Sequence, residues 1–448
     1  MSFDTVLVAN RGEIALRVIE ACRELGLQSV VVHSEADADM PYLALADRAV
    51  CIGPAEPAKS YLNIAAIISA ATLNGAGAIH PGYGFLSENP HFVEVCEEHG
   101  VTLIGPSRAC MSLVGDKQAA REAVAAAGVP VLPGMLLPED RTRWQEAADS
   151  IGYPLLIKSV YGGGGRGMRW VNAPEELPAK IAAAAEEARG ASGQSALYLE
   201  KAMSSPRHIE VQVLADGYGR MVHVGERDCS VQRRHQKLIE ESPAPNLPPQ
   251  VRDAVCAAAL TAARAVGYRN AGTVEFVLGP DHAFFFIEMN ARIQVEHSVS
   301  EMVCGMNLIK EQIRIALGEP LALTQEEISL RGHAIECRIN AEDVGRGFLP
   351  SCGTVHIDQL PGGHGIRLDT ALYQGMKVQP HYDSLLAKLL AWGTTREEAL
   401  TRMGKALQRM RLTGVSTTTP LLEEILHHPA FRRGDVTTAF VEELISPA

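Results

Sequence analysis

The sequence predicts two fold classes in one chain: an α/β domain with a doubly wound parallel sheet at the N-terminus, followed by α+β structure. In residues 1–115, short β-branched runs alternate with helices of about 10–15 residues, as in βαβ units. From residue 203 onward the strands are longer, alternate polar and apolar residues, and are joined by hairpin turns. The length of 448 residues, at roughly 150 per domain, agrees with about three domains.

The N-terminal elements justify the parallel sheet. Each apolar strand run is followed by a segment with helical spacing, and Gly26 is placed to end the first helix. The expected strands are Thr5–Ala9, Ser29–His33, Ala49–Ile52, Gly77–His80 and Val101–Ile104, and the expected helices are Glu13–Leu25, 62–73 and 89–99.

The middle of the chain divides into a linking helix and a small domain. Residues 116–130 are rich in alanine and close with Gly128 and Pro130, which predicts a helix. Residues 131–202 follow as the small domain, and residues 203–448 as one large α+β domain. Within the small domain the expected elements are helices near 139–150 and 175–190 and strands at Leu155–Ser159, Met168–Val171 and Ala196–Glu200.

The composition excludes several classes of protein. There are 41 Lys and Arg against 53 Asp and Glu, and the net charge of −12 argues against nucleic acid as the main partner. The nine cysteines are scattered without a CxxC pair, which fits reduced thiols in a cytoplasmic protein better than a zinc site or disulfides. Residues 60–87 carry no charge but contain five Gly and Pro residues, so no membrane helix is expected there.

A glycine-rich loop at 162–167 is the first candidate for function. It lies between two predicted strands, so it does not open a helix as a dinucleotide motif does. In a hairpin, such a loop can fold its backbone N–H groups over nucleotide phosphates. The alternative is a flexible hairpin tip. Lys158, just before the loop, favours the phosphate interpretation because a cation beside the phosphates is what such a site needs.

A carboxylate hairpin at 275–290 is the most informative stretch. The predicted strands Gly272–Leu278 and Phe284–Asn290 are joined by Gly-Pro-Asp-His, and a turn at 280–283 places Glu275 opposite Glu288. Two carboxylates opposite each other lie ~5 Å apart and repel, unless a cation such as Mg²⁺ lies between them. Asn290 shares their face. The alternative is a solvent-exposed strand face on which both Glu side chains are hydrated.

Two further polar stretches are candidates for binding. Polar residues alternate with mostly apolar ones from Glu288 to Glu296, and we expect the strand to end near Asn290 so that the chain can turn back. The segment RDCSVQRRHQK at 227–237 contains five residues that can be cationic, and it predicts either an anion pocket or a basic patch on a surface loop.

Long motifs are distributed over most of the sequence. They are VANRGEIALR at 8–17, HPGYGFLSEN at 80–89, GDK at 115–117, GGGGRGM at 162–168, ERDCSVQRRHQK at 226–237, EMNARIQVEH at 288–297 and GHAIECRINAED at 332–343. In these motifs the chain resembles the biotin carboxylases, which are ATP-grasp enzymes. The resemblance implies an ATP-grasp fold in which residues 131–202 form a lid over the nucleotide.

The resemblance also implies the residues of the site. For ATP these are Lys117, Lys158, Gly163, Gly164, Gly165, Met168, Glu200, Lys201, Ala202, Met203, His208, Gln232, His235, Glu275 and Glu288. For the metal, Mg²⁺ or Mn²⁺, they are Glu275, Glu288 and Asn290. For bicarbonate they are Lys237, Arg292, Gln294, Val295 and Glu296. For the ureido oxygen of biotin the residue is Arg338.

The implied activity is the ATP-dependent carboxylation of biotin through carboxyphosphate, the first half-reaction of a carboxylase such as acetyl-CoA carboxylase. Lys237, Arg292, Glu296 and Arg338 are then the catalytic residues, with Glu296 as the base for bicarbonate. The implied partners are a biotin carboxyl carrier protein, carboxyltransferase subunits and a second copy in a homodimer, and no nucleic acid or membrane. The alternatives are an ATP-grasp ligase for a different carboxylate and a non-catalytic scaffold subunit.

Overall fold

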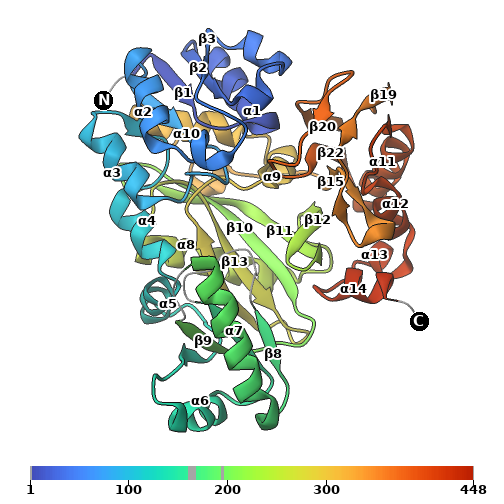
Figure 1. The fold of residues 1–448 in the computed structure, drawn as a ribbon. Helices are drawn as coiled ribbons and strands as arrows, with labels where there is room; N and C mark the ends of the chain where they lie inside the picture. Colours follow the sequence, from blue (N-terminus) through green and yellow to red (C-terminus); the bar gives the residue numbers. More distant parts are fainter. Residues whose placement is uncertain (1–2, 160–167, 193–195, 447–448) are drawn as a thin grey trace.

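The computed structural model describes residues 3–159, 168–192 and 196–446. Three larger sheets organise these residues: a five-stranded sheet, a four-stranded sheet and an eight-stranded sheet. Figure 1 shows the N-terminal unit and the lid unit at opposite ends of the large sheet, with the C-terminal helices beside it. The site must therefore be built from segments that are far apart in the sequence.

The N-terminal sheet is parallel throughout, and its strand order is β3-β2-β1-β4-β5. All four residues of β1 are buried, as expected for a strand covered by helices on both faces. The doubly wound sheet is thus confirmed. Its elements are β1 (Thr5–Val8), α1 (Gly12–Glu24), β2 (Gln28–His33), β3 (Arg48–Cys51), α2 (Ile64–Leu73), β4 (Ala78–His80), α3 (Pro90–Glu98) and β5 (Thr102–Leu103).

The strand order reverses between β1 and β4, and the loops after these two strands meet there. Asn10 donates side-chain hydrogen bonds to the carbonyls of Pro81 (2.7 Å) and Tyr83 (2.8 Å). Crevices at such reversal points are where open α/β sheets bind ligands. In this chain the reversal brings Glu13 and Tyr83 against the large sheet: Glu13 forms an ion pair with Lys388 of that sheet at 3.0 Å, and the Tyr83 hydroxyl donates to Glu13.

Two helices, rather than one, connect the N-terminal unit to the lid. They are α4 (Arg108–Gly115) and α5 (Lys117–Ala126), so the expected helix over 116–130 is too long and its neighbour was not expected. Asp116 separates them: its carboxylate accepts from the backbone of Gln118 (3.1 Å) and Ala119 (3.0 Å) and caps α5. The helix ends four residues before Pro130 because its last turn closes at Ala127.

The lid contains a four-stranded antiparallel sheet of order β6-β9-β7-β8. Leu155, Ile157, Val171 and other apolar residues on one face pack on its helices. The expected helix near 139–150 begins later, at Trp144, and the glycine-rich loop at 162–167 lies outside the described residues. The elements are β6 (Gly134–Leu136), α6 (Trp144–Ile151), β7 (Leu155–Ser159), β8 (Arg169–Val171), α7 (Leu177–Ser192) and β9 (Leu197–Lys201).

The large sheet is antiparallel and has the order β14-β13-β10-β11-β12-β15-β22-β20. It joins residues 207–290 to residues 333–393 through the β12–β15 pair. Its strands are β10 (Arg207–Ala215), β11 (Met221–Arg233), β12 (Gln236–Ser242), β13 (Asn270–Leu278), β14 (Phe284–Asn290), β15 (His333–Asn340), β20 (Ile366–Thr370) and β22 (Leu385–Gly393).

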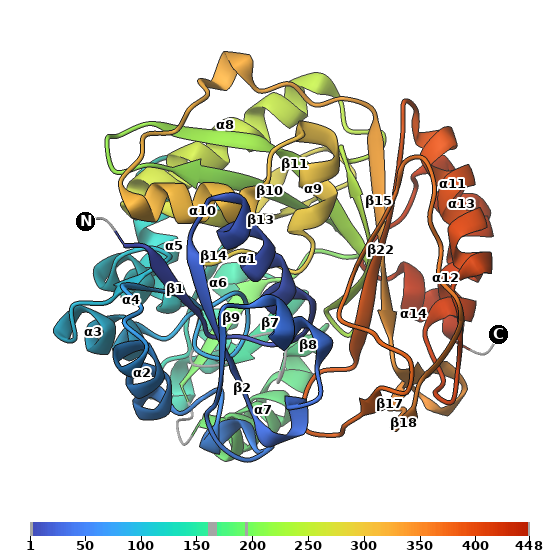
Figure 2. The same ribbon diagram turned by 90° about the horizontal axis from the view of Figure 1, so that it is seen from above.

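Helices cover one face of this sheet, so that face is apolar. Ile209, Val211 and Phe276 pack on α8, and Ile335 and Leu389 pack on α11 and α12. Figure 2 shows α8 over β10 and β11, and the C-terminal helices beside β15 and β22. The helices are α8 (Pro249–Ala265), α9 (His297–Cys304), α10 (Leu308–Leu317), α11 (Arg396–Arg409), α12 (Thr419–His427), α13 (Pro429–Arg433) and α14 (Phe440–Ile445).

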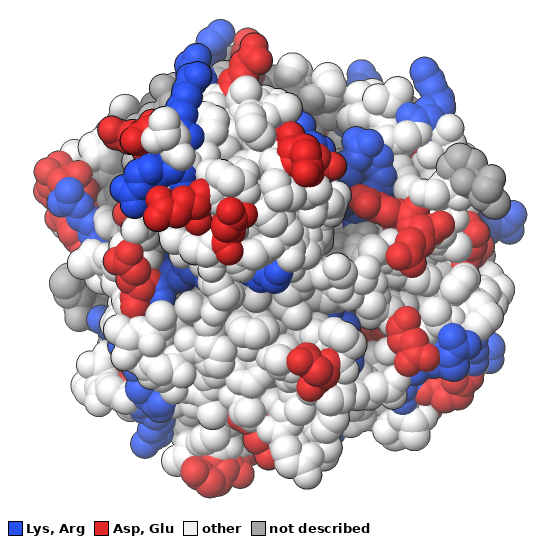
Figure 3. Space-filling model, turned by 90° about the horizontal axis from the view of Figure 1, so that it is seen from below, with Lys and Arg blue, Asp and Glu red and all other residues white. Residues whose placement is uncertain are grey.

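Short strands complete the C-terminal part, and no helix in the described parts of the chain is both long and apolar enough to cross a membrane. On the face shown in Figure 3, basic and acidic side chains are interspersed around a broad area of other residues. The short strands are β16 (Glu342–Asp343), β17 (Leu349–Pro350), β18 (Gly353–Thr354), β19 (His356–Gln359), β21 (Lys377–Val378) and β23 (Arg411–Thr413).

The β13–β14 hairpin pairs Glu275 with Glu288, as predicted, although the register near the turn is different. Leu278 lies opposite Phe284, one residue away from the predicted pairing. A bulge at Ile287, between the pairs Phe276–Phe286 and Glu275–Glu288, inserts one residue and restores the register. The strand ends at Asn290 and the chain turns into α9, which confirms the expected end of the strand.

Candidate active site

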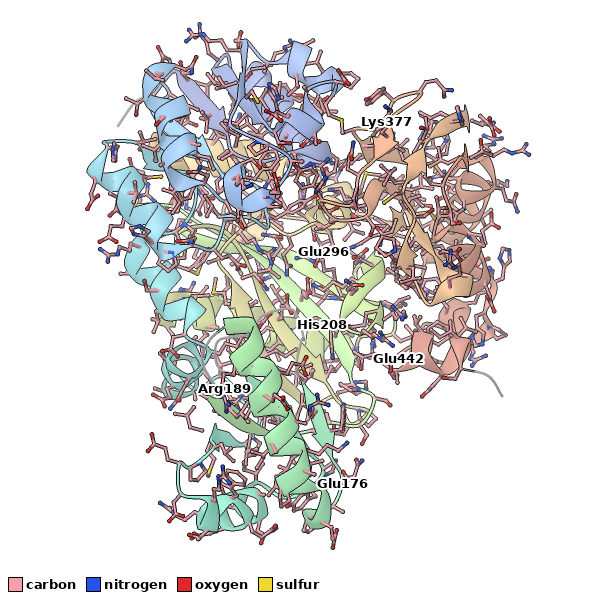
Figure 4. All side chains as sticks on the ribbon, in the orientation of Figure 1. Glu176, Arg189, His208, Glu296, Lys377 and Glu442 are labelled. Atoms are coloured by element: carbon pink, nitrogen blue, oxygen red, sulfur yellow. The ribbon has the colours of Figure 1, made fainter. Side chains whose placement is uncertain are left out.

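The second face of the large sheet carries buried charged side chains. Three of them, Arg227, Glu210 and Glu275, form one row across β11, β10 and β13. The partly exposed Glu288 on β14 extends the row, because each residue lies opposite the next. Three adjacent carboxylates repel unless cations balance them. Figure 4 places His208 and Glu296 near the middle of the molecule, between the lid and the N-terminal unit.

Arg227 balances one end of the row and is completely buried. Its guanidinium donates to Glu210 (2.9 Å), Thr273 (2.9 Å), Gln212 (3.0 Å) and Gln294. The segment 227–237 is therefore not a surface loop: it forms the end of β11, a turn and the start of β12. Arg227 organises the polar face, while the turn residues Arg234 and His235 are exposed.

Lys237 lies where three carboxylates converge. Its ammonium group donates to Glu210, to Glu296 at 2.5 Å and to Glu275 at 3.5 Å. Burial alone lowers the pKa of a lysine, but the three carboxylates together raise the pKa of Lys237 well above its usual value. Lys237 is therefore a permanent cation at the centre of the site.

Glu296 joins Lys237 to Arg338. Burial raises the pKa of a carboxyl group, but Lys237, Arg338 and Arg227 together hold the pKa of Glu296 well below its usual range. Arg338 donates to Glu296 at 2.8 Å and to Glu240 at 2.6 Å. Glu296 is thus an ionised acceptor between two cations, both of which can also approach an anionic ligand.

Glu275 and Glu288 differ in their surroundings although they face each other. Glu275 is buried and accepts from Gln294 (2.6 Å), Asn290 (2.7 Å) and His208 (2.9 Å), and Lys237 and His208 lower its pKa against the opposing effect of burial. Glu288 is partly exposed and forms an ion pair with Lys117 at 3.0 Å. The two carboxylates and the Asn290 amide oxygen are hard oxygen donors on one face, so their chemistry fits Mg²⁺ or Mn²⁺.

A second group of possible metal ligands lies beside this pair. One ligand atom each from His208, Glu210 and Glu275 lie within 4.8 Å of one another. Glu210, however, already binds Arg227 and Lys237. Glu288 is the more accessible partner for Glu275, so the oxygen-donor set fits better.

Two of the predicted nucleotide lysines, Lys158 and Lys117, lie within the electrostatic field of Glu200 on the lid. Lys158 donates to Glu200, and so does Arg121 of α5 at 2.8 Å. The Glu200 charge also raises the pKa of Lys117, after Glu288 and Glu275, against the effect of burial. Lys117 therefore lies between the lid and the hairpin, within the fields of carboxylates from both.

The predicted ATP contacts continue from Glu200 to Met203, in the segment that leads from β9 toward β10 and is called the hinge below. The backbone N–H of Ala202 donates to Pro154 at 3.0 Å, which ties the hinge to the start of β7. Lys201 turns away from the site, because its ammonium group donates to the carbonyl of Tyr153 at 2.6 Å. Met203 lies near Gly279, at the end of β13.

The three remaining nucleotide candidates are on β10, on β11 and in the following turn. The ring of His208 lies between Glu275 and Gln232, whose amide is 3.3 Å from His208 Nδ1. Its pKa is raised, because Glu275 and Glu210 outweigh burial and Lys237. His235 and Arg234 form a two-residue turn with φ values of 65° and 47°, the geometry of a tight hairpin.

The side chains predicted to bind bicarbonate do not all converge on one point of the site. Gln294 joins Arg227 to Glu275, and Val295 gives its carbonyl to the fully buried Lys388 at 3.0 Å. Arg292 forms an ion pair with Glu88 at 3.1 Å and donates to Asn290 at 3.1 Å. Among the described contacts of Arg292 there is no hydrogen bond to Glu296, although the Glu296 charge contributes to raising the pKa of Arg292.

Several residues of the site were not predicted, among them Glu210, Glu240 and Lys388. Glu210 had a signal, because polar and apolar residues alternate in the run His208–Val213. No sequence pattern pointed to Glu240 or Lys388, because each meets its partners through strands that are distant in the sequence. A cavity of about 360 Å³ also opens beside Glu13 and Tyr83, and its lining includes Lys377 (Figure 4).

Three family models match the chain in succession. The model for the biotin carboxylase N-terminal domain matches residues 2–111, and that for the ATP-binding domain of the carbamoyl-phosphate synthase L chain matches residues 116–324. The model for the biotin carboxylase C-terminal domain matches residues 336–443. Together they cover most of the sequence.

Curated relatives are similar over most or all of their length. A biotin carboxylase from Nostoc sp. is 50% identical over 445 residues, which are 99% of this chain and 100% of the relative. A biotin carboxylase from Haemophilus influenzae is 51% identical and covers 98% of both chains. A pyruvate carboxylase subunit from Methanothermobacter thermautotrophicus is 48% identical, covering 98% of this chain and 90% of the relative.

Solved structures share the fold. A biotin carboxylase from Campylobacter jejuni in complex with a β,γ-ATP compound superposes with a TM-score of 0.96, at 45% identity and 99% coverage of both chains. The biotin carboxylase domain dimer of 2-oxoglutarate carboxylase from Hydrogenobacter thermophilus, with MgADP, ADP and bicarbonate, gives a TM-score of 0.95 at 48% identity. That match covers 99% of this chain and 98% of the other.

Proposed function

The chain belongs to the biotin carboxylase family, and we propose that it carboxylates biotin on a separate carrier protein, using ATP and bicarbonate. The observation that carries this proposal is the series Lys237–Glu296–Arg338 beside the Glu275–Glu288 hairpin. It provides cations for an anionic substrate, an ionised base between them and oxygen donors for a metal within one polar face.

The nucleotide is proposed to lie between the lid and the large sheet. Lys117 and Lys158 bind its phosphates, since both are cations beside carboxylates that phosphate oxygens can replace. The remaining proposed contacts are Gly163, Gly164, Gly165, Met168, Glu200, Lys201, Ala202, Met203, His208, Gln232 and His235; the three glycines lie outside the described residues.

Glu275, Glu288 and Asn290 would hold Mg²⁺ or Mn²⁺, and a metal bound there neutralises charge on the phosphates during transfer. The chain contributes alignment and fixed charges. Asn290 is anchored through its amide N–H to Glu275, which leaves its oxygen, now accepting from Arg292, as the third donor. The hairpin thus holds three oxygen groups in place before any ligand binds.

Bicarbonate is proposed to bind at Glu296 with Lys237, Arg292, Gln294 and Val295. Glu296 is ionised, as a general base must be, because the neighbouring cations hold its pKa low. When bicarbonate binds, its negative charge competes for Lys237, which weakens the hold of that cation on Glu296 and makes the carboxylate a stronger base. Attack of bicarbonate on the γ-phosphate of ATP then yields carboxyphosphate and ADP.

Biotin is proposed to react beside Arg338. Carboxyphosphate releases CO₂ and phosphate, the phosphate takes the N1 proton of biotin, and N1 attacks CO₂. The ureido oxygen becomes negative in this step, and a fixed guanidinium stabilises it. Glu240, buried behind Arg338, holds the guanidinium in position.

The proposed partners are a biotin carboxyl carrier protein and carboxyltransferase subunits, which select the final acceptor. The relatives support a role as one component of a larger carboxylase, and the solved domain dimer from Hydrogenobacter thermophilus supports a homodimer. The nine cysteines are all unpaired, which supports a reducing compartment, and we propose the cytoplasm.

The test measures phosphate release by the purified chain with ATP and Mg²⁺. We expect release to require bicarbonate and to increase when free biotin is added, with carboxybiotin as the product. An ATP-grasp ligase for another carboxylate would not respond to biotin. A scaffold protein without catalytic activity would show no bicarbonate-dependent release at all.

A further inference from the structure

Trp170 is a large exposed side chain on the lid sheet, with 42% of its surface accessible. It lies opposite Leu156 in the β7–β8 ladder, and Leu156 lies opposite Glu200 in the β7–β9 ladder. Residues that oppose each other in a ladder project from the same face. The indole therefore shares a face with Glu200, the carboxylate that binds Lys158 and Arg121.

The other face of the lid sheet is already filled. Leu155, Ile157, Val171, Leu197 and Leu199 alternate with the residues above and pack on α6 and α7. Figure 1 shows α7 crossing the lid sheet beside β8. The face with Trp170 is thus the one that looks toward the proposed nucleotide site, and α5 reaches it through Arg121, near Glu200.

The face of the lid sheet that carries Trp170 has two ends, which are distinguished by their position along β7. Lys158 follows Leu156 by two residues, ~6–7 Å along β7, and lies opposite Tyr198. Trp170, Leu156 and Glu200 form the row nearer the hinge, where Ala202 binds Pro154. If the phosphates lie at Lys158, the base of the same nucleotide lies over the hinge row.

We propose that Trp170 stacks on the adenine base of ATP and fixes the affinity of the lid for that base. The inference rests on the proposed nucleotide site and extends it to a residue that the sequence analysis did not assign. Stacking suits the position, because an indole at the edge of a sheet offers a flat apolar surface that otherwise faces water. Leu156, directly opposite, extends the same apolar surface.

Two variants test the role of the indole. Trp170→Leu removes the aromatic surface, and Trp170→Phe keeps a smaller one. We expect the KM for ATP to rise about tenfold in Trp170→Leu and about threefold or less in Trp170→Phe, since loss of base stacking typically weakens binding by this order. The kcat and the KM for bicarbonate should stay within about twofold, because no group at the phosphates has changed.

Intrinsic fluorescence provides a second test, because a purely structural role of Trp170 would not make its fluorescence depend on ATP. The chain has three tryptophans, and Trp144 and Trp392 donate their indole N–H groups to carbonyls at 2.9 and 2.8 Å. Stacking on a base should quench Trp170 when ATP is added. The quenching should disappear in Trp170→Leu and persist in the control Trp392→Phe.

The possible outcomes separate the two proposals. If the unmodified chain cleaves ATP with bicarbonate but Trp170→Leu keeps its KM and its quenching, Trp170 does not touch the base and the inference is overturned alone. A Trp170→Leu variant that loses binding to a carrier protein but not to ATP would overturn it as well, in favour of a docking surface. If ATP neither binds nor is cleaved by the unmodified chain, the proposed function is overturned and the inference with it.

Discussion

Two pairs of glutamates face each other across the large sheet, and they have opposite surroundings. Glu275 and Glu288 oppose each other on β13 and β14, and Glu240 and Glu336 on β12 and β15. The first pair meets Lys117, Lys237 and His208, and part of Glu288 is exposed. The second pair is completely buried, and three of its four oxygens have no hydrogen-bond partner among the described residues.

The difference shows that the ladder geometry alone does not determine the function of a carboxylate pair. Cations lower the pKa of Glu275, which leaves it ionised and able to bind a metal. Burial raises the pKa of Glu336 well above its usual value, although Lys388 and Arg338 oppose the effect, and Glu240 and Asp369 add to it. The surroundings of the first pair thus favour a bound cation, whereas burial favours the protonated form of Glu336 in the second.

The first prediction removes one carboxylate from the pair Glu275–Glu288, called the open pair here because part of Glu288 is exposed. Glu288→Gln should lower ATP turnover by about 10³ or more, because the hairpin then offers the metal a single carboxylate. The measurement is bicarbonate-dependent phosphate release at ordinary Mg²⁺ concentration, with Glu424→Gln on the exposed surface of α12 as the matched control. Turnover close to that of the control would contradict the assignment of Glu288 as a ligand.

The second prediction separates the two half-reactions at Arg338. Arg338→Gln should lower carboxybiotin formation by about 10²–10³ but retain slow bicarbonate-dependent ATP cleavage, because the guanidinium is assigned to the ureido oxygen alone. Glu296→Ala should lose both activities. Phosphate release and carboxybiotin formation are measured together with a melting curve. Equal loss of both outputs in Arg338→Gln, or only a lower Tm, would mean that Arg338 is a structural residue of β15.

The third prediction concerns the completely buried pair Glu240–Glu336, called the closed pair here, and tests whether its Glu240 positions Arg338. Glu240→Gln weakens the acceptor for Arg338 Nε, now at 2.6 Å, without changing its size. We expect the ratio of carboxybiotin to phosphate to fall by about 10–100-fold, the usual effect of losing a group that orients a reactive one. Because the charge of Arg338 itself remains, the loss should be smaller than in Arg338→Gln. An unchanged ratio would show that Glu240 has no positioning role.

The fourth prediction has the smallest effect and concerns pH. The folded protein binds a proton at Glu336 more tightly than the unfolded chain does, so the stability contributed by this group falls as pH rises above the ordinary glutamate pKa. The Glu336→Gln variant does not undergo this loss of stability as pH rises. Its Tm relative to the unmodified protein should therefore be higher by about 2 °C at pH 8 and should approach that of the unmodified protein near pH 4. A difference that is independent of pH would mean that Glu336 is ionised in the folded protein.

The open pair could be predicted from the sequence, and the closed pair could not. The turn at 280–283 and the alternation of β13 and β14 are local, so they placed Glu275 opposite Glu288 even though a bulge at Ile287 was needed to restore the register. Glu240 meets Glu336 across a gap of about a hundred residues, and no local pattern specifies that β12 pairs with β15.

The cluster of carboxylates around Lys237 could not be predicted for the same reason, because it also depends on long-range contacts. Its three carboxylates come from β10, β13 and the segment before α9, and each needs a different long-range contact. The family motifs included Lys237 and Glu296 but gave no distances. Helix α4 was missed for a local reason, because the alanine-rich pattern begins only at residue 116, where Asp116 caps α5.

The β12–β15 pair also limits how this chain can be recombined. The second and third family models meet between residues 324 and 336, yet the sheet crosses that boundary through four residue pairs, among them Glu240–Glu336. In a chimera whose C-terminal third comes from a relative, β12 comes from one parent and β15 from the other. Such exchanges should succeed when β12 and β15 come from the same parent. A junction after Leu317 separates these two strands, so it is a worse crossover point than its place in a loop suggests.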